Sequence, residues 1–141
     1  MDRKSFLSNL RSIIGSPYRW GAWGPDLFDC SGTVSFCLGL SSKRDAAELF
    51  SDYKGLAVPF AQAAPGCLVF YGTDINHIDH VMSVLEHWDN GYIVLAGACH
   101  GDSSTISLDR AKEQGACICT QPQEYWFSHR VTCVDPFSTI S

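Results

Sequence analysis

The sequence predicts an α+β fold with N-terminal helices packed on an antiparallel β-sheet. Apolar residues recur at helical spacing in the first third of the chain, and short strand-like runs separated by turn signals make up the second half. A length of 141 residues with 45% hydrophobic and 12% aromatic residues suits one packed core and argues against a disordered chain. We therefore expect a single domain over residues 1–141.

Three helices are predicted before the sheet. Phe6, Leu10 and Ile13 recur at helical spacing and predict a first helix, which Gly15 ends. A turn-rich segment containing several glycines follows this helix and leads to the next. The predicted helices cover residues 3–14, the apolar segment from 30 to about 40, and residues 44–53.

The predicted strands lie in the second half of the chain. They are short runs rich in apolar or branched residues, several of them bounded by turn-forming residues. Asn90-Gly91 is a two-residue hairpin signal between two of these runs. The strands are expected at residues 67–71, 80–87, 92–96, 116–120 and 129–134, and residues 108–114 are expected to form one or two helical turns.

Charge and hydropathy exclude several classes of protein. The formal net charge is −5 and the sequence pI is about 5.4, so we expect no general nucleic-acid binding, which needs a positive surface. We expect no membrane insertion, because no apolar run approaches the roughly 20 residues of a membrane span. Residues 1–10 lack the apolar centre of a secretory signal. We therefore expect synthesis in the cytoplasm, with another carrier if the protein acts outside it.

The seven cysteines predict neither a full set of disulfides nor a metal site. Their number is odd, and without an export signal we expect reduced thiols. A structural zinc site would need close cysteine pairs with two to four residues between the two cysteines, and the sequence lacks such pairs. We expect no metal and no cofactor.

Cys30 is the cysteine whose position favours chemistry. It lies where the glycine-containing loop meets a predicted helix N-terminus. Unpaired N–H groups and the helix dipole favour negative charge there, so we expect a lowered thiol pKa and a site for an oxyanion. The alternative is a buried core cysteine, which is the usual state of a thiol.

A nucleophilic cysteine needs a base, and His80 is the best-placed histidine. It begins a predicted strand, from which its side chain could reach a helix N-terminus packed on the sheet. His77 and His87 are expected to be solvated, and His129 could be structural.

Three motifs resemble the NlpC/P60 family of cysteine peptidases. They are Pro-Tyr-Arg-Trp-Gly-Ala at 17–22 with Phe-Asp-Cys-Ser-Gly at 28–32, Pro-Gly-Cys-Leu-Val-Phe-Tyr-Gly at 65–72, and His-Val-Met-Ser-Val at 80–84. The resemblance runs from about residue 18 to residue 96. It implies a papain-like α+β fold and cleavage of cell-wall peptides, often at the bond between D-γ-glutamate and the diamino acid.

The resemblance also implies roles for individual residues. Cys30 would be the nucleophile and His80 the general base, and Tyr18 would help to position the thiolate and its oxyanion. Asp29 and Ser31 match residues that in some family members bind the free amine of a stem peptide. Tyr18 could instead be a core aromatic, and Asp29 suits a helix N-cap.

The third catalytic residue is left open. The family usually has a polar residue, often histidine, on the strand after the histidine strand and just before an alanine. Here Leu95 precedes Ala96 at that place. His100 is our candidate, Asp102 is a weaker one, and a Cys30–His80 dyad is the alternative.

The function expected from this resemblance is a thiol endopeptidase acting on peptidoglycan stem peptides. The segments at 125–130 and 134–137 resemble the end of phage-type members, which points to a phage enzyme or an effector, with phage tail or secretion-machine proteins as partners. The alternatives are an amidase or acyltransferase with another substrate, and a non-catalytic virion module that keeps the fold.

Overall fold

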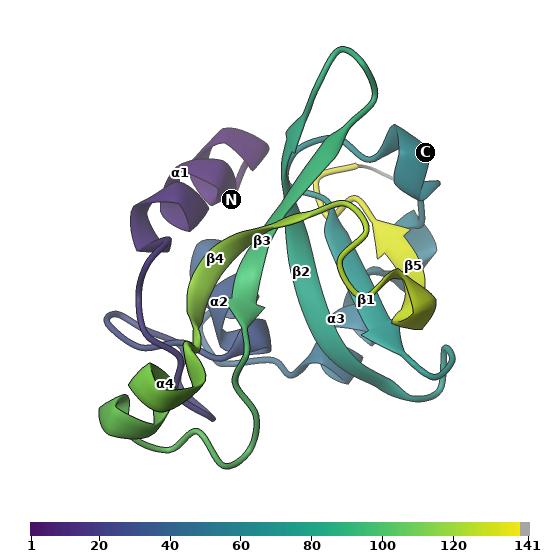
Figure 1. Ribbon diagram of the computed structural model, residues 1–141. Coiled ribbons are helices and arrows are strands. Elements are labelled where there is room, and N and C mark those ends of the chain that lie inside the picture. The colour runs from purple at the N-terminus through teal and green to yellow at the C-terminus, as the bar shows by residue number, and fades with distance from the viewer. Residues whose placement is uncertain (139–141) are drawn as a thin grey trace.

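A five-stranded antiparallel sheet with helices packed against it dominates the computed structural model, which describes residues 1–138 (Figure 1). The strand order is β4-β3-β2-β1-β5. The predicted α+β class is confirmed, and every predicted helix and strand is present with shifted ends. The helices are α1 (Arg3–Ile13), α2 (Cys30–Cys37), α3 (Ala46–Tyr53) and α4 (Leu108–Gln114). The strands are β1 (Leu68–Gly72), β2 (Ile78–His87), β3 (Ile93–Cys99), β4 (Cys117–Pro122) and β5 (Arg130–Val134). Short 3₁₀ turns occupy Lys54–Leu56, Phe60–Gln62 and Phe127–His129.

The sheet is buried on both faces. Helices α2 and α3 pack on β2, and α1 packs on α2. Along β2, Val81 and Leu85 enter the apolar cluster under the helices, while Met82 and Val84 enter a second cluster on the opposite face. Alternate residues of a strand point to opposite faces, so burial of both faces explains why the strands are apolar runs rather than alternating ones.

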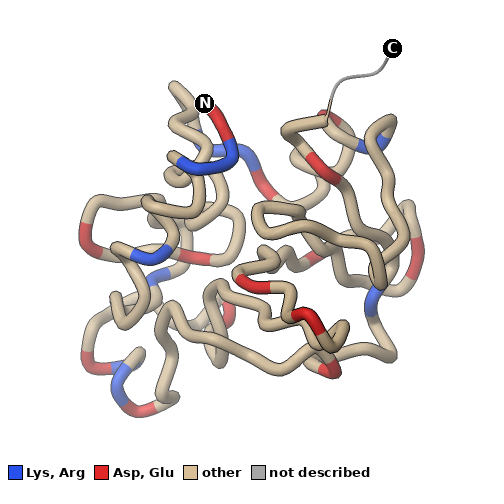
Figure 2. Tube along the Cα trace, turned by 90° about the horizontal axis from the view of Figure 1, so that it is seen from above, with Lys and Arg blue, Asp and Glu red and all other residues tan. Residues whose placement is uncertain are grey.

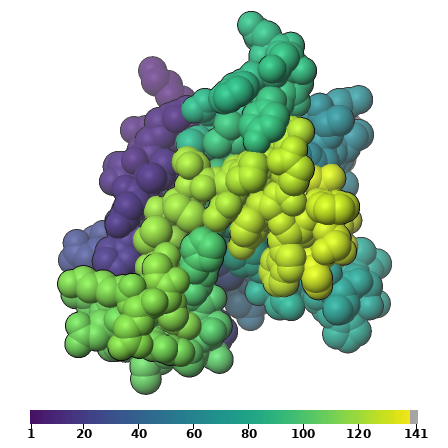
Figure 3. All heavy atoms as spheres, viewed as in Figure 1, coloured from purple at the N-terminus to yellow at the C-terminus, as the bar shows by residue number. Residues whose placement is uncertain are grey.

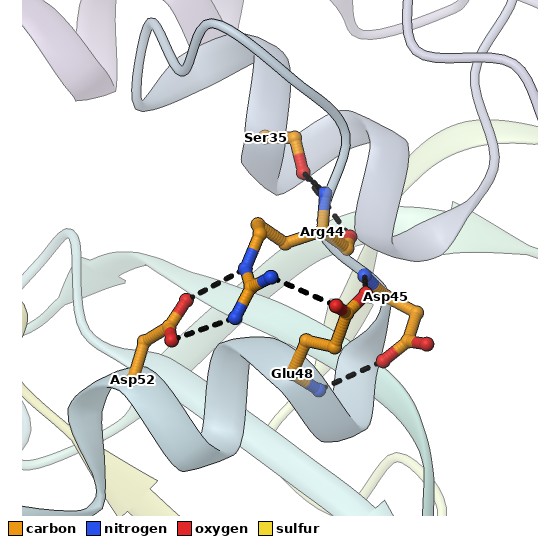
Figure 4. A network of polar contacts seen from close by, with 5 residues as sticks. All are labelled: Ser35, Arg44, Asp45, Glu48 and Asp52. Atoms are coloured by element: carbon orange, nitrogen blue, oxygen red, sulfur yellow. Dashed lines mark hydrogen bonds and ion pairs between the residues drawn. The ribbon is translucent and has the colours of Figure 1, made fainter.

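A polar network around Arg44 holds the connection between α2 and α3 (Figure 4). The Arg44 N–H donates to Ser35 Oγ on α2 at 3.0 Å, and its guanidinium contacts both carboxylate oxygens of Asp52 at 2.9 and 2.8 Å and Glu48 at 2.8 Å. Asp45 and Glu48 form a capping box at the start of α3. The network fixes the loop before α3. This loop carries Lys43, which pairs with Asp29 at the start of α2.

The β2–β3 hairpin differs from the expected two-residue turn. Strand β2 ends at His87 and β3 begins at Ile93, so five residues connect them. The Trp88 N–H donates to Tyr92 O at 2.8 Å, and the two rings pack with centroids 5.1 Å apart. The aromatic pair closes the connection outside Asn90-Gly91, and the prediction of a two-residue turn is wrong.

Charged residues are dispersed over the chain. Figure 2 shows Lys and Arg in separate parts of the trace, with Asp and Glu between them.

Within residues 1–138, none of the helices combines the length and the apolar character that a membrane span requires. The prediction of one domain over 1–141 includes residues 139–141, which lie outside the described part of the chain.

Candidate active site

Cys30 is the first residue of α2, and Asp29 caps this helix. Asp29 Oδ1 accepts from the Gly32 N–H at 2.6 Å. Asp29 Oδ2 accepts from the Gly21 N–H at 2.9 Å and pairs with Lys43 Nζ at 3.0 Å. Lys43 comes from the loop that the Arg44 network holds. The Asp29 carboxylate therefore connects the turn-rich segment, the first turn of α2 and the loop before α3, next to Cys30.

A close approach of the backbone explains why the residue after Cys30-Ser31 is the glycine Gly32. The Asp29 N–H donates to Ala22 O at 2.9 Å, which brings the turn-rich segment against the first turn of α2. A Cβ at Gly32 would collide with this same Ala22 oxygen. The close approach that positions the cysteine therefore requires a residue without a side chain.

A cavity of about 590 Å³ brings the candidate residues together. The turn-rich segment and the start of α2 form one part of its wall, and the start of β2, the end of β3 with its following loop, and the segment after β4 form the rest. Figure 3 shows the surface hollowed between the green lobe containing α4 and the yellow segment that follows β4. The lining residues are Tyr18, Trp20, Cys30, Asp79, His80, Ala98, His100, Gly101, Asp102, Ser103, Tyr125 and Trp126.

The Cys30 thiol is neutral in the resting site. Burial, followed by the negative charge of Asp29, raises its pKa to about 11. Backbone hydrogen bonds from Val81 and Ser31 and the charge of Lys43 lower the pKa by less. The sequence-based expectation of a lowered pKa is therefore wrong, because burial and the capping carboxylate outweigh the helix N-terminus. The contact with Val81 also shows that the start of β2 reaches the sulfur.

His80 lies in an aromatic enclosure at the start of β2. Its ring centroid is 5.5 Å from that of Tyr71, 6.0 Å from that of Tyr125 and 5.7 Å from that of Trp126. Burial lowers the pKa of His80 to about 4, so the imidazole is neutral near pH 7 and can accept a proton. The Tyr125 hydroxyl lies 3.3 Å from His80 Nε2.

Tyr18 lies in the cavity wall with Cys30. It is buried, and its ring lies against Gly101, where a Cβ would come within 2.5 Å of the ring carbons. Burial, followed by the charges of Cys30 and Asp29, raises the pKa of Tyr18 above its ordinary value. The hydroxyl therefore stays protonated and can donate a hydrogen bond to negative charge in the cavity.

Asp29 and Ser31 lie beside the cavity rather than in its lining. Both are buried, and Ser31 Oγ donates to Asp29 Oδ1 at 3.4 Å. The contacts of Asp29 with two backbone N–H groups and Lys43 give it the N-cap role that was the alternative expectation. The predicted contact with a substrate amine would require Asp29 to exchange one of these partners.

The structure does not bring His100, the candidate third catalytic residue, into hydrogen-bond contact with the His80 ring. His100 follows the end of β3 with a left-handed backbone (φ 67°) and is exposed at the cavity wall. Asp102 accepts from Ser104 of its own loop at 2.7 Å. Within residues 1–138, the hydrogen-bond partner of His80 Nε2 is the Tyr125 hydroxyl.

Leu95 does not occupy the place that the sequence comparison gave it. It pairs with Val84, four residues along β2 from His80. Continuing the register from Ser83–Ala96 toward the cavity places Cys99 across from His80, and the contact of Gly97 with Met82 follows the same register. Leu95 belongs to the second apolar cluster, so its side chain does not bear on the pairing of Cys30 with His80.

Tyr125 and Trp126 are the site residues that the sequence analysis missed. They come from the segment after β4, which the sequence analysis noted only for its resemblance to phage-type members. Trp126 is 42% exposed, and across the cavity Trp20 is 53% exposed. The aromatic run from 125 to 127 was the sequence feature that could have indicated these residues. Tyr125 is 45 residues from His80 in the sequence, so the contact between them could not be predicted from spacing. Residues 1–138 contain no cluster of three or more His, Cys, Asp and Glu side chains arranged to hold a metal ion.

An α+β domain with a helix-start cysteine and a strand histidine in one cavity defines the papain-like class of fold. The chain belongs to the NlpC/P60 family, whose sequence profile matches residues 15–133. It is 37% identical over 86 residues to the "Probable endopeptidase p60" of Listeria grayi, covering 55% of this chain and 16% of that protein. It is 35% identical over 71 residues to a probable endopeptidase of Corynebacterium glutamicum, covering 48% of this chain and 33% of that protein. The chain therefore spans a third or less of these relatives.

Solved structures show the same fold at low sequence identity. An NlpC/P60 family protein from Bacillus cereus matches with a TM-score of 0.70 and 15% identity, over 98% of this chain and 41% of that one. The NlpC/p60 domain of the peptidoglycan hydrolase SagA matches with a TM-score of 0.63 and 20% identity, over 95% and 98% of the two chains. These likenesses confirm the predicted fold.

Proposed function

We propose that this chain is a cysteine endopeptidase that hydrolyses amide bonds of peptidoglycan stem peptides. The observation that carries the proposal is the cavity in which a helix-start thiol and a neutral imidazole lie on facing elements. Family membership supports it, as do the names of the relatives, which include endopeptidases and a peptidoglycan hydrolase.

The first chemical step joins proton transfer to attack. His80 takes the proton of the Cys30 thiol while the sulfur bonds to the amide carbonyl carbon, and the carbonyl oxygen becomes an oxyanion. The protonated Tyr18 hydroxyl is a donor that can stabilise this oxyanion. The low pKa of His80 makes the imidazolium a strong acid, so it returns its proton to the leaving amine as the carbon–nitrogen bond breaks.

The second step releases the acyl group. Water loses a proton to the neutral His80 and attacks the thioester carbon, and the carbon–sulfur bond breaks. The carboxylic acid product leaves, and His80 returns the proton to the sulfur. No cofactor enters this sequence of steps.

The bond that we propose as the target is the D-γ-glutamyl–diamino acid amide, which the family resemblance favours. Its test is the mass of the fragments released from a defined stem peptide. Delivery to the wall by a virion or a secretion machine remains a prediction. Leu95 was the feature that favoured a non-catalytic module, but it pairs with Val84 and not with His80, so Leu95 itself does not bear on that alternative.

The test is hydrolysis of purified sacculi and of a defined stem peptide by the chain and by Cys30→Ala. We expect release of peptide fragments by the parent chain and a loss of at least about 10³-fold in the variant, because nothing replaces the nucleophile. Cys117→Ala is the matched control, since Cys117 is a partly exposed thiol on β4 outside the cavity lining. Unchanged hydrolysis by Cys30→Ala would remove the proposal.

A further inference from the structure

The Tyr125 hydroxyl forms a hydrogen bond with one of the two ring nitrogens of His80. A residue that positions the imidazole would bind one ring nitrogen in this way. The Tyr125 hydroxyl lies 3.3 Å from Nε2, which leaves Nδ1 as the imidazole nitrogen that can take a proton from the thiol. A neutral imidazole carries its hydrogen on only one nitrogen. The group bound to Nε2 therefore decides whether Nδ1 is a base or a donor.

Strand β3 does not supply this group. Cys99 is the β3 residue that the continued register places across from His80, but its thiol donates to Gly97 O of its own strand at 3.4 Å. A thiol is a weak hydrogen-bond partner in any case. His100 is exposed, and within residues 1–138 no hydrogen bond joins it to His80.

Tyr125 is held where it can act on the ring. Its N–H donates to Pro122 O at 2.9 Å in the turn after β4. Its ring packs edge-on against Tyr71 with centroids 5.7 Å apart, and Tyr71 also flanks His80 at 5.5 Å. The two tyrosines and the histidine form one packed group, so the hydroxyl has a fixed position relative to Nε2.

We propose that Tyr125 is the positioning residue of the catalytic pair, its hydroxyl oxygen accepting a hydrogen bond from Nε2–H of His80 so that Nδ1 stays free for the thiol proton. This inference rests on the proposed function. If the hydroxyl instead donated to Nε2, Nδ1 would carry the hydrogen and could not act as the base. The direction of one hydrogen bond therefore separates a competent site from an incompetent one.

The direct test is the tautomer of His80 in the parent chain, measured by long-range ¹H–¹⁵N correlation with ¹⁵N-labelled histidine. His80→Gln assigns the signal among the five histidines. We expect the Nε2–H form near pH 7. Detection of the Nδ1–H form as the main species would overturn the proposal. This readout does not depend on substrate, so it distinguishes failure of the inference from failure of the proposed peptidase activity.

The second test is Tyr125→Phe, which keeps the ring and removes the hydroxyl. We expect kcat on the stem peptide to fall roughly 10- to 100-fold with KM little changed, and the His80 spectrum to shift toward a mixture of tautomers. Tyr92→Phe in the hairpin is the matched control and should change neither. An unaltered tautomer and kcat in Tyr125→Phe would contradict the proposal, whatever the parent activity.

Discussion

Acidification should destabilise the folded chain through His80 by about 2 kcal/mol at pH 5. Burial lowers the pKa of His80 to about 4 in the folded state, against about 6.5 for a histidine in an unfolded chain. Between these values the unfolded chain binds more protons, so stability is full above pH 6.5 and falls as the pH drops. The linkage relation gives a loss of about 2 kcal/mol at pH 5 and about 3 kcal/mol at pH 4.

The assay is urea unfolding at pH 7, 5 and 4 for the parent chain and for His80→Gln. Glutamine is neutral at every pH and its amide N–H can donate to Tyr125, so the difference between the two pH slopes isolates His80 from the other histidines. We expect the parent to lose about 2 kcal/mol more than the variant between pH 7 and pH 5. Parallel losses would show that His80 titrates normally and is not buried as described.

The remaining predictions concern the surroundings of the thiol. Asp29→Asn keeps a capping oxygen but removes the charge that raises the Cys30 pKa, so the pH midpoint of Cys30 alkylation by iodoacetamide should fall below about 11; an unchanged midpoint would exclude the carboxylate as a cause. Gly101→Ala places a Cβ within 2.5 Å of the Tyr18 ring, and we expect kcat on the stem peptide to drop by about tenfold or more as the ring moves. Full activity of Gly101→Ala would show that the position of Tyr18 does not matter.

Local chemistry explains what could be predicted from the sequence. The start of α2 follows from Asp29 as an N-cap and from the glycine that lets the turn-rich segment approach. The place of His80 near the start of β2 follows from the apolar run after it, although the strand begins two residues earlier, at Ile78. These local features made Cys30 and His80 candidates, and the family resemblance selected them as a pair. The structure packs α2 on β2 and places both residues in the lining of one cavity.

Strand register and long-range contacts explain what could not be predicted. Across the five-residue hairpin, Leu95 pairs with Val84, and continuing this register places Cys99 across from His80. Hairpin length and register depend on the turn geometry, which the sequence did not indicate. The contact of Tyr125 with His80 depends on how the segment after β4 folds back over the sheet. No spacing in the sequence indicates such a contact.

The opposed pKa shifts of Cys30 and His80 decide when the thiolate forms. A helix N-terminus alone would favour a preformed thiolate, yet Asp29, which creates that N-terminus by capping it, also raises the pKa of the thiol. With the thiol near 11 and the imidazole near 4, the neutral pair is the resting state. In the proposed reaction, charge separation then accompanies attack on the bound carbonyl, where the oxyanion donors and the attraction between the new charges offset its cost. In that reaction the imidazole must be ready to accept the proton at the moment of attack, so the direction of the His80–Tyr125 hydrogen bond matters.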